Sequence, residues 1–535
     1  MQLLKEDTRR MMGQDVVFKN ISAINELSAI HRTCMGPHGQ SKLVVTHLGR
    51  TLISRRTSTI VENLAVEHPA AKLVVMAANH QATEVGDGTT FVITLAGEIL
   101  EKVKPFLEMR LSIKDLVEGL DMAMRKTLEI LPELAVFSVP NVVDIPTATR
   151  VIKCVIGTKM NGYEHTLAPL VAQACADILP SDPKKFLVEN VRVAKVLGGN
   201  IADSSVIRGF CLTRDTEGTV KHIRNAKLAV FGCAVDKDEG ETKGTITISN
   251  ADELKNYSVG EEQRMKQIID DVARTGANVI VTGATFGEIA EHFIEAHGMM
   301  AIKVPSKFDL RRLCLATGAT ALVRLGAPTA EEMGHCAAID AQEVGGTRVL
   351  VLSQEGGSAT SRISTILVRA ATQNTLDEIE KVIEDGVNVF KTMTRDQRFL
   401  AGAGACEMEL SHRLEGYGRS IPGLQQYGVR AFAEALAVVP KTLAENAGMN
   451  FNDVLSNLRS AHTAGKATWG VLSMENTIGD AAAAGIYDSL LAKEWAFKFI
   501  TEAVRTVLSV DQIIMSKPAG GPKPRDQQAG DAGDD

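Results

Sequence analysis

Apolar residues recur at intervals of three or four near both ends of the chain. The first such run predicts an amphipathic helix over residues 12–34, which ends at the turn signal Gly36-Pro37-His38-Gly39. A second helix is expected over residues 70–84, and residues 90–135 have an almost wholly helical pattern. The same pattern returns at 374–391 and from 404 to 509. Both ends of the chain are therefore predicted to be helical.

The middle of the chain has a different pattern. From about residue 187, short apolar runs alternate with turn residues, and a charged helical stretch at 252–275 precedes a βαβα pattern over 277–317. The expected strands are 191–196, 206–212, 227–231, 245–248, 277–282, 300–304, 348–353 and 363–369. The simplest topology joins the helical ends into one discontinuous domain and inserts the α/β segment as a separate body. Residues 518–535, rich in Pro, Gly and Asp, are expected to be a disordered tail.

Composition narrows the class of protein. A chain of 535 residues is too long for one core, so two to four domains are expected. The net charge of −7 and the aromatic content of 4% argue against a nucleic-acid or anionic-lipid surface. No run is long and uncharged enough to cross a bilayer, and the N-terminus lacks a secretory core, so a cytoplasmic location is expected. The eight scattered cysteines favour reduced thiols over disulfides or a zinc site.

The candidate chemistry centres on Gly86-Asp87-Gly88-Thr89-Thr90, which leads directly into an apolar run. A carboxylate between two glycines at the start of a helix suits a phosphate and its metal. Glycine lets the backbone approach closely, free amides face the anion, and Asp87 would hold Mg²⁺. Taken alone, however, an ordinary Asp-Gly turn with threonine as helix N-cap is the more economical interpretation.

Further stretches reverse that preference, because together they resemble a subunit of the group II chaperonin of the eukaryotic cytosol (CCT/TRiC). The stretches are residues 32–39, 68–72, 86–90, 316–319 and 510–514, so the resemblance covers almost the whole chain. Residues 308–314, 332–336 and 517–524 resemble one particular paralogous subunit of that family.

The resemblance implies a multidomain α+β and α/β chaperonin fold. Residues 1–140 and 397–517 would form a helical, discontinuous equatorial domain that binds ATP. Residues 141–210 and 364–396 would form a small intermediate domain, and 211–363 an α/β apical domain with a helical lid protrusion at or near 252–275. The implied function is ATP-dependent protein folding in a double ring of eight-membered rings of different paralogues, which encloses unfolded clients and closes the lid on hydrolysis. Family membership suggests actin- and tubulin-like clients, with no nucleic acid or membrane partner.

The resemblance also implies residue roles. Asp87 matches the Mg²⁺ ligand, and Asp385 matches the carboxylate that polarises the attacking water. Lys159 matches a sensor of the γ-phosphate, and Asp488 a ribose ligand. The remaining nucleotide-binding positions are Gly36, Pro37, Gly39, Gly88, Thr89, Thr90, Gly402 and Gly404. Without the resemblance, Asp385 would be taken for a solvated helix residue and Lys159 for a surface lysine.

Two positions depart from the family pattern. Arg56 stands where most members have an aspartate that helps to place water and metal. Near the phosphates it would add a contact of roughly 1.5–3 kcal/mol and favour nucleotide retention. Loss of the carboxylate would slow the chemistry by about 10²–10⁴. The alternative is that Arg56 points to solvent and that Asp87 with Asp385 suffices. Ala403 replaces a glycine, so its methyl group would crowd the base or strain the loop if the position needs a positive φ.

Three function classes are compared. The leading one is an ATP-driven folding subunit. The second is a structural ring subunit that binds nucleotide and clients but hydrolyses ATP poorly or not at all. A metabolic nucleotide-dependent enzyme has little support, because no compact substrate site accompanies the phosphate loops. For clients, Arg311 and Arg312 are candidate contacts to acidic segments, although pairing with Asp309 or with a neighbouring subunit is an equal alternative.

Overall fold

The computed structural model describes residues 9–12, 14–46, 49, 51–236, 251–354 and 363–515. The predicted strand at 245–248 and the predicted tail at 518–535 lie outside these residues.

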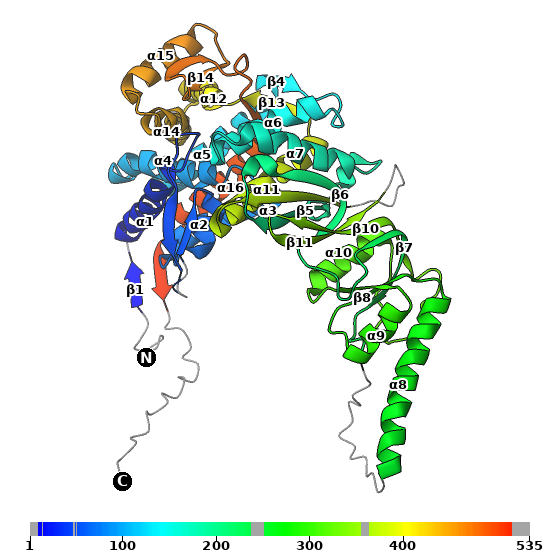
Figure 1. Ribbon diagram of the computed structural model, residues 1–535. Helices are drawn as coiled ribbons and strands as arrows, with labels where there is room; N and C mark the ends of the chain where they lie inside the picture. The colour runs from blue at the N-terminus through cyan, green and yellow to red at the C-terminus, as the bar shows by residue number, and fades with distance from the viewer. Residues whose placement is uncertain are drawn as a thin grey trace, which may run out of the picture.

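Segments from both ends of the chain build one helical body (Figure 1). Its helices are α1 (Gln14–Arg32), α2 (Thr57–Asn63), α3 (Pro69–Glu84), α4 (Thr89–Glu108), α5 (Ile113–Ile130), α12 (Ala405–Ser420), α13 (Gln425–Leu436), α14 (Val438–Asn446), α15 (Phe451–Thr463) and α16 (Leu490–Leu508). Helix α4 lies at the centre of this body, because Ile93, Leu95 and Ile99 are fully buried on different sides of it. Such all-round burial accounts for the long apolar run after Thr90.

Small antiparallel sheets complete the helical body. They are β1 (Arg9–Met12) with β17 (Gln512–Met515), β2 (Lys42–Val45) with β3 (Thr51–Ser54), and β14 (Trp469–Leu472) with β15 (Thr477–Asp480). A three-stranded sheet has the order β16 (Tyr487–Ser489), β13 (Arg398–Ala401), β4 (Ala135–Ser138). The region 404–509 is thus helix-rich but interrupted by strands.

A second core lies beside the first and is covered by three helices. These are α6 (Ile145–Lys159), α7 (Glu164–Asp177) and α11 (Gln373–Arg395). Helix α11 packs against β5 (Val191–Leu197) and β12 (Ser364–Ala370), which pair in parallel with Ser364 opposite Val191. Helix α7 packs against β12, and α6 packs against α7 and α11. Helix α11 is strongly amphipathic, and its buried face includes Ile379, Ile383 and Phe390. Short 3₁₀ turns lie at Leu131–Leu134, Pro183–Lys185, Val188–Asn190 and Ile201–Asp203.

One eight-stranded sheet runs from this second core into the α/β region. Its order is β5-β12-β6-β11-β10-β7-β8-β9, with β6 (Ser205–Leu212), β11 (Thr347–Ser353), β10 (Gly334–Val344), β7 (His222–Phe231), β8 (Val279–Thr282) and β9 (Met300–Lys303). Helix α10 (Lys307–Thr317) covers one face, and α8 (Ala251–Arg274) with α9 (Glu288–Ala296) covers the other. Alternate residues of β7 serve the two faces, since Val230 packs towards α10 and Phe231 towards α8. Helix α8 projects beyond the sheet in Figure 1.

Strand β10 has no counterpart among the strands expected from the sequence. It pairs antiparallel with both β7 and β11, and Ile339 lies opposite Ile223 and Leu352. Its second half carries Asp340, Gln342 and Glu343, so its apolar alternation is weak. The long pairing with two neighbours, rather than its own composition, makes it a strand.

Candidate functional site

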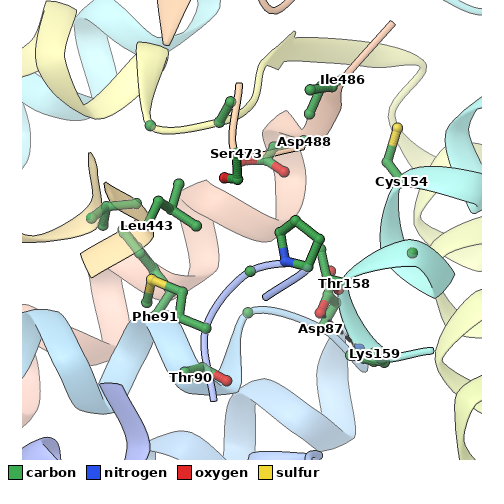
Figure 2. A pocket seen from close by; sticks show the side chains of 18 of the residues that line it. Asp87, Thr90, Phe91, Cys154, Thr158, Lys159, Leu443, Ser473, Ile486 and Asp488 are labelled. Carbon is green, nitrogen blue, oxygen red and sulfur yellow. Dashed lines mark hydrogen bonds and ion pairs between the residues drawn. The ribbon is translucent and has the colours of Figure 1, made fainter. Parts of the chain in front are cut away.

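A cavity of about 650 Å³ opens where the helical body meets α6 and α11. Eight of the predicted nucleotide-binding residues line it together with Asp87 and Asp385; they are Gly36, Pro37, Gly88, Thr89, Thr90, Lys159, Gly404 and Asp488. The two departures, Arg56 and Ala403, also line it, whereas Gly39 and Gly402 do not. Figure 2 shows Asp87 and Lys159 together in one part of the cavity and Asp488 near Ile486 in another.

The turn between α3 and α4 has the geometry expected of an anion site. Gly86 and Gly88 both have φ +82°, which a side chain would disfavour. Gln81 holds the turn, because its Nε2 donates to the carbonyl oxygen of Asp87 at 2.8 Å and to that of Ala492 at 3.1 Å. The N-cap of α4 is Gly88, and no side chain caps the helix. The simple interpretation of threonine as the cap is therefore wrong, and the first amides of α4 are left for a ligand.

The loop after α1 is fixed by Arg55, which directly follows β3. Nη2 of Arg55 donates to the carbonyl oxygens of Gly36 at 2.8 Å and Pro37 at 2.7 Å. A Cβ at Gly39 would lie 2.4 Å from the Cys34 oxygen. Gly39 is thus needed for the shape of the loop, although it does not line the cavity.

Four charged groups meet across the cavity. Nζ of Lys159, at the end of α6, lies 3.0 Å from Oδ1 of Asp87 and 2.8 Å from Oδ2 of Asp385. Nη2 of Arg56 lies 2.6 Å from Oδ1 of Asp385, and its Nη1 lies 3.5 Å from Oε2 of Glu384. The Asp385 side chain is completely buried. Asp385 is therefore not a solvated helix residue, and Lys159 is not an ordinary surface lysine.

The position of Arg56 corrects one alternative from the sequence. Its side chain is only 16% exposed and points to α11, not to solvent. Its partners are carboxylates on a different core, which motif matching does not predict.

The charges shift one another's protonation. Burial alone would raise the pKa of Asp87, but Lys159, the Gly88 amide and Lys493 outweigh it and lower the pKa. Burial raises the pKa of Asp385, although Lys159 and Arg56 act against that shift. The pKa of Lys159 is raised, because Asp385 and Asp87 together outweigh its desolvation. The lysine thus stays charged between two carboxylates.

The other part of the cavity is organised by Lys493 of α16, which the sequence analysis missed. Its Nζ lies 3.2 Å from Oδ2 of Asp488, contacts the fully buried Glu407, and sits 4.3 Å from the ring centroid of Phe91. Desolvation lowers the pKa of Lys493, but Asp488 and Glu407 more than reverse this and raise it. Nothing in the sequence singles out the pair of Lys493 and Glu407, because α12 and α16 each carry several charged residues.

Ala403 adopts the backbone conformation that glycine favours. Its φ is +56°, and its carbonyl oxygen accepts a hydrogen bond from the Val471 amide at 2.9 Å. The amide of Gly402 donates to the Ile486 oxygen at 3.0 Å. Strain was expected at Ala403 if the position has a positive φ. The observed φ is positive, so the loop is strained there.

The arginines of α10, Arg311 and Arg312, do not line this cavity. Nη1 of Arg312 lies 3.6 Å from Oδ1 of Asp309, and the same oxygen lies 3.2 Å from Nη2 of Arg192 on β5. Arg311 is exposed. Pairing with Asp309, one of the two alternatives, is thus what the structure has for Arg312.

The donor set suits a metal only in company with a phosphate. Among the described residues there is no group of three or more His, Cys, Asp or Glu side chains that could hold a metal ion. Mg²⁺ binds through one or two carboxylates together with phosphate oxygens and water, which Asp87 beside the α4 amides would allow. The residues therefore fit a nucleotide-bound Mg²⁺ rather than an independent metal centre.

Two observations concern the rest of the described chain. None of its helices combines the length and apolarity that a bilayer crossing requires. All eight cysteines lie within it, and none forms a disulfide.

Comparison with known proteins gives consistent matches over nearly the whole chain. Residues 27–518 match the TCP-1/cpn60 chaperonin family. T-complex protein 1 subunit theta of Homo sapiens is 45% identical over 527 residues, which cover 98% of this chain and 95% of the relative. The theta subunit of Dictyostelium discoideum is 42% identical over 533 residues, or 99% of both chains. A probable theta subunit of Schizosaccharomyces pombe is 42% identical over 98% of this chain and 96% of its own length.

Proposed function

The chain belongs to the TCP-1/cpn60 chaperonin family, and we propose that it is the theta-type subunit of a hetero-oligomeric chaperonin that folds proteins with ATP. The resemblance predicted from the motifs is confirmed by the relatives. The observation that carries the proposal is the cavity in which Asp87, Lys159 and Asp385 converge from two separate cores.

In this proposal the triphosphate is bound by the open amides of α4, by the hydroxyls of Thr89 and Thr90, and by the Gly36-Pro37 loop. Asp87 would hold Mg²⁺, which neutralises phosphate charge. Lys159 would turn from the carboxylates to the γ-phosphate. Asp385 would orient the attacking water and accept its proton. Asp488, fixed by Lys493, would accept from the ribose hydroxyls, and Gly402 and Gly404 would shape the adjoining loop.

The remaining assignments follow the family pattern. The helical body, residues 1–140 and 397–517, would be the equatorial domain. Residues 141–210 and 364–396 would be the intermediate domain, and 211–363 the apical domain with α8 as part of the lid, although β6 spans the boundary at 210. The subunit would stand among different paralogues in a cytoplasmic double ring of eight-membered rings and enclose unfolded clients of the actin and tubulin type. The exposed Arg311 would contact acidic client segments.

A second candidate function is supported by Arg56. Both carboxylate oxygens of Asp385 already face a cation, Arg56 on one side and Lys159 on the other. Lys159 can leave for a phosphate, but Arg56 keeps one oxygen from water. The subunit would then bind ATP and clients but hydrolyse ATP poorly.

Single-turnover ATP hydrolysis tests both candidate functions. The rings used carry, in every other subunit, a substitution of the carboxylate that matches Asp385, so that only this subunit can hydrolyse ATP. Asp385→Asn should slow hydrolysis by about 10²–10⁴ without loss of ATP binding. Asp377→Asn is the matched control, because Asp377 lies on the same helix but pairs with Lys195 outside the cavity. Arg56→Asp should speed hydrolysis if the second candidate is right, and an unchanged rate would count against it. A stable native monomer with small-molecule turnover would contradict the chaperonin assignment itself.

A further inference from the structure

Helix α11 contacts the helical body along one face. Glu378 accepts a hydrogen bond from the Arg55 backbone amide, Asp385 meets Arg56, and Asn388 lies against Gly86. These α11 positions are separated by seven and three residues, so they share one side of the helix. The face that closes over the cavity is therefore defined by contacts with the two arginines and the Gly86 turn.

The contacts at Arg56 join two separate cores. The side chains of Ile60 and Val61, on α2 just after Arg56, pack with the helical body, whereas Ile383 and Val387, on either side of Asp385, belong to the second core. Arg56 reaches two consecutive carboxylates, one fully buried and one half exposed. An ion pair between fixed cores acts as a clasp, because opening the cavity would leave the charge of Asp385 without this partner.

Arg56 is held in place for this role by contacts of its own backbone. Its amide donates to Oγ of Ser54 at 3.1 Å, and its carbonyl oxygen accepts from the Ile60 amide at 3.1 Å as the N-cap of α2. Its neighbour Arg55 is anchored on the Gly36-Pro37 loop. The guanidinium thus projects from a fixed backbone, and little ordering is needed to form the clasp.

A second ion pair, between Lys159 and Asp87, also crosses the cavity, but nucleotide would break it. Lys159 on the second core pairs with Asp87 on the helical body. In the proposed nucleotide complex Lys159 would pair with the γ-phosphate and Asp87 with Mg²⁺. ATP binding would therefore break the ion pair between Lys159 and Asp87. The Arg56 contacts involve no group assigned to the phosphates, the ribose or Mg²⁺, so nucleotide binding would leave them in place.

We propose that Arg56 is a positioning residue that clasps α11 over the cavity in the absence of nucleotide. The cavity is then closed before ATP binds, and closure in this subunit does not depend on the γ-phosphate. This inference rests on the proposed function only in taking ATP as the ligand of the closed cavity.

Carbodiimide labelling of carboxylates, followed by tandem mass spectrometry of the complete chaperonin, tests the clasp without nucleotide. Asp385 is fully buried and Asp377 on the same helix is 41% exposed, so the wild type should label Asp385 at least about tenfold more slowly. In Arg56→Met, labelling of Glu378, which lies two turns along α11 from Asp385, should rise roughly tenfold. Arg56→Lys should keep most of the protection, because it retains the charge.

The nucleotide response separates positioning from general destabilisation. ATP should leave Glu378 labelling unchanged in the wild type but suppress it in Arg56→Met, where closure has become nucleotide-dependent. The matched control is Arg32→Met, which removes an ion pair within the helical body, 2.5 Å from Arg32 Nη2 to Glu98 Oε2, and should leave Glu378 unchanged.

Two results would overturn the proposal. One is rapid labelling of Asp385 in the nucleotide-free wild type, and the other is unchanged Glu378 labelling in Arg56→Met. A separate ATP-binding measurement distinguishes the two proposals. If the wild type binds no ATP, the proposed function fails, while the nucleotide-free labelling still decides whether the clasp exists.

Discussion

Substituting Gly86 by alanine should push α11 off the cavity. A Cβ at this position would lie 2.3 Å from Cβ of Asn388. No rotamer change can move that atom, since Cβ is fixed to the helix backbone. Helix α11 would have to retreat by about 1 Å to reach van der Waals contact, and such overpacking costs about 1–3 kcal/mol.

Gly162→Ala provides a matched control near the same cavity. Both glycines are left-handed, with φ +82° at Gly86 and +92° at Gly162, so alanine pays a similar backbone cost of about 1–2 kcal/mol at each. A Cβ at Gly162 would have nothing within 4 Å. The difference between the two variants therefore isolates the contact with α11.

The assay is carboxylate labelling of Asp385 in the intact assembly. The overpacking cost predicts that Gly86→Ala shifts the opening equilibrium by a factor of roughly 5 to 150, with a matching rise in Asp385 labelling. Gly162→Ala should label like the wild type at Asp385. Equal labelling in the two variants would refute the claim that the Gly86 turn and α11 close on each other.

Three further outcomes are expected. Hydrogen bonding from His462 and pairing with Arg413 lower the pKa of Glu409 to about 2, so its contribution to stability is complete above the ordinary glutamate pKa and is lost as the pH falls towards 2. Glu409→Gln should lower the free energy of unfolding by roughly 3 kcal/mol at neutral pH. In this variant the thermal midpoint should also depend less on pH over that acid range. Lys493→Met leaves the buried Glu407 without its cation, so it should lower the free energy of unfolding, measured in urea, by about 3–5 kcal/mol. The control Lys498→Met breaks a more exposed pair with Glu494 and should lower it by less than about 1 kcal/mol. Ala403→Gly should raise the free energy of unfolding by at most about 1 kcal/mol in the same titration, since relief of the left-handed strain is partly offset by glycine's backbone entropy.

Local patterns were enough for the elements that bury a continuous face. The periodic run near the N-terminus predicted α1, and the apolar run after Thr90 predicted the buried α4. Strand β10 was not predicted, because its conformation depends on pairing with the two neighbouring strands, β7 and β11. A pattern within one segment cannot report a partner that lies elsewhere in the chain.

The site shows the same limit more sharply. The Gly86 to Thr90 turn could be identified from its own residues, because its chemistry is local. The chemical setting of Asp385 could not, since its burial and both its cations come from segments hundreds of residues away. The orientation of Arg56 was equally undetermined, because the motif fixes its place in the chain but not the acidic helix that it meets.

The charge at position 56 therefore decides how this cavity closes. With aspartate there, as the family resemblance implies, a carboxylate would face Asp385 and Glu384 and repel them, so closure would need a cation brought by the nucleotide. Arginine reverses the sign of that interaction and supplies the cation from the chain itself. The same guanidinium that keeps α11 in place also occupies an oxygen of Asp385 that water would need. Under the second candidate function, tight closure and slow hydrolysis would be two consequences of one ion pair, and Arg56→Asp should reverse both together.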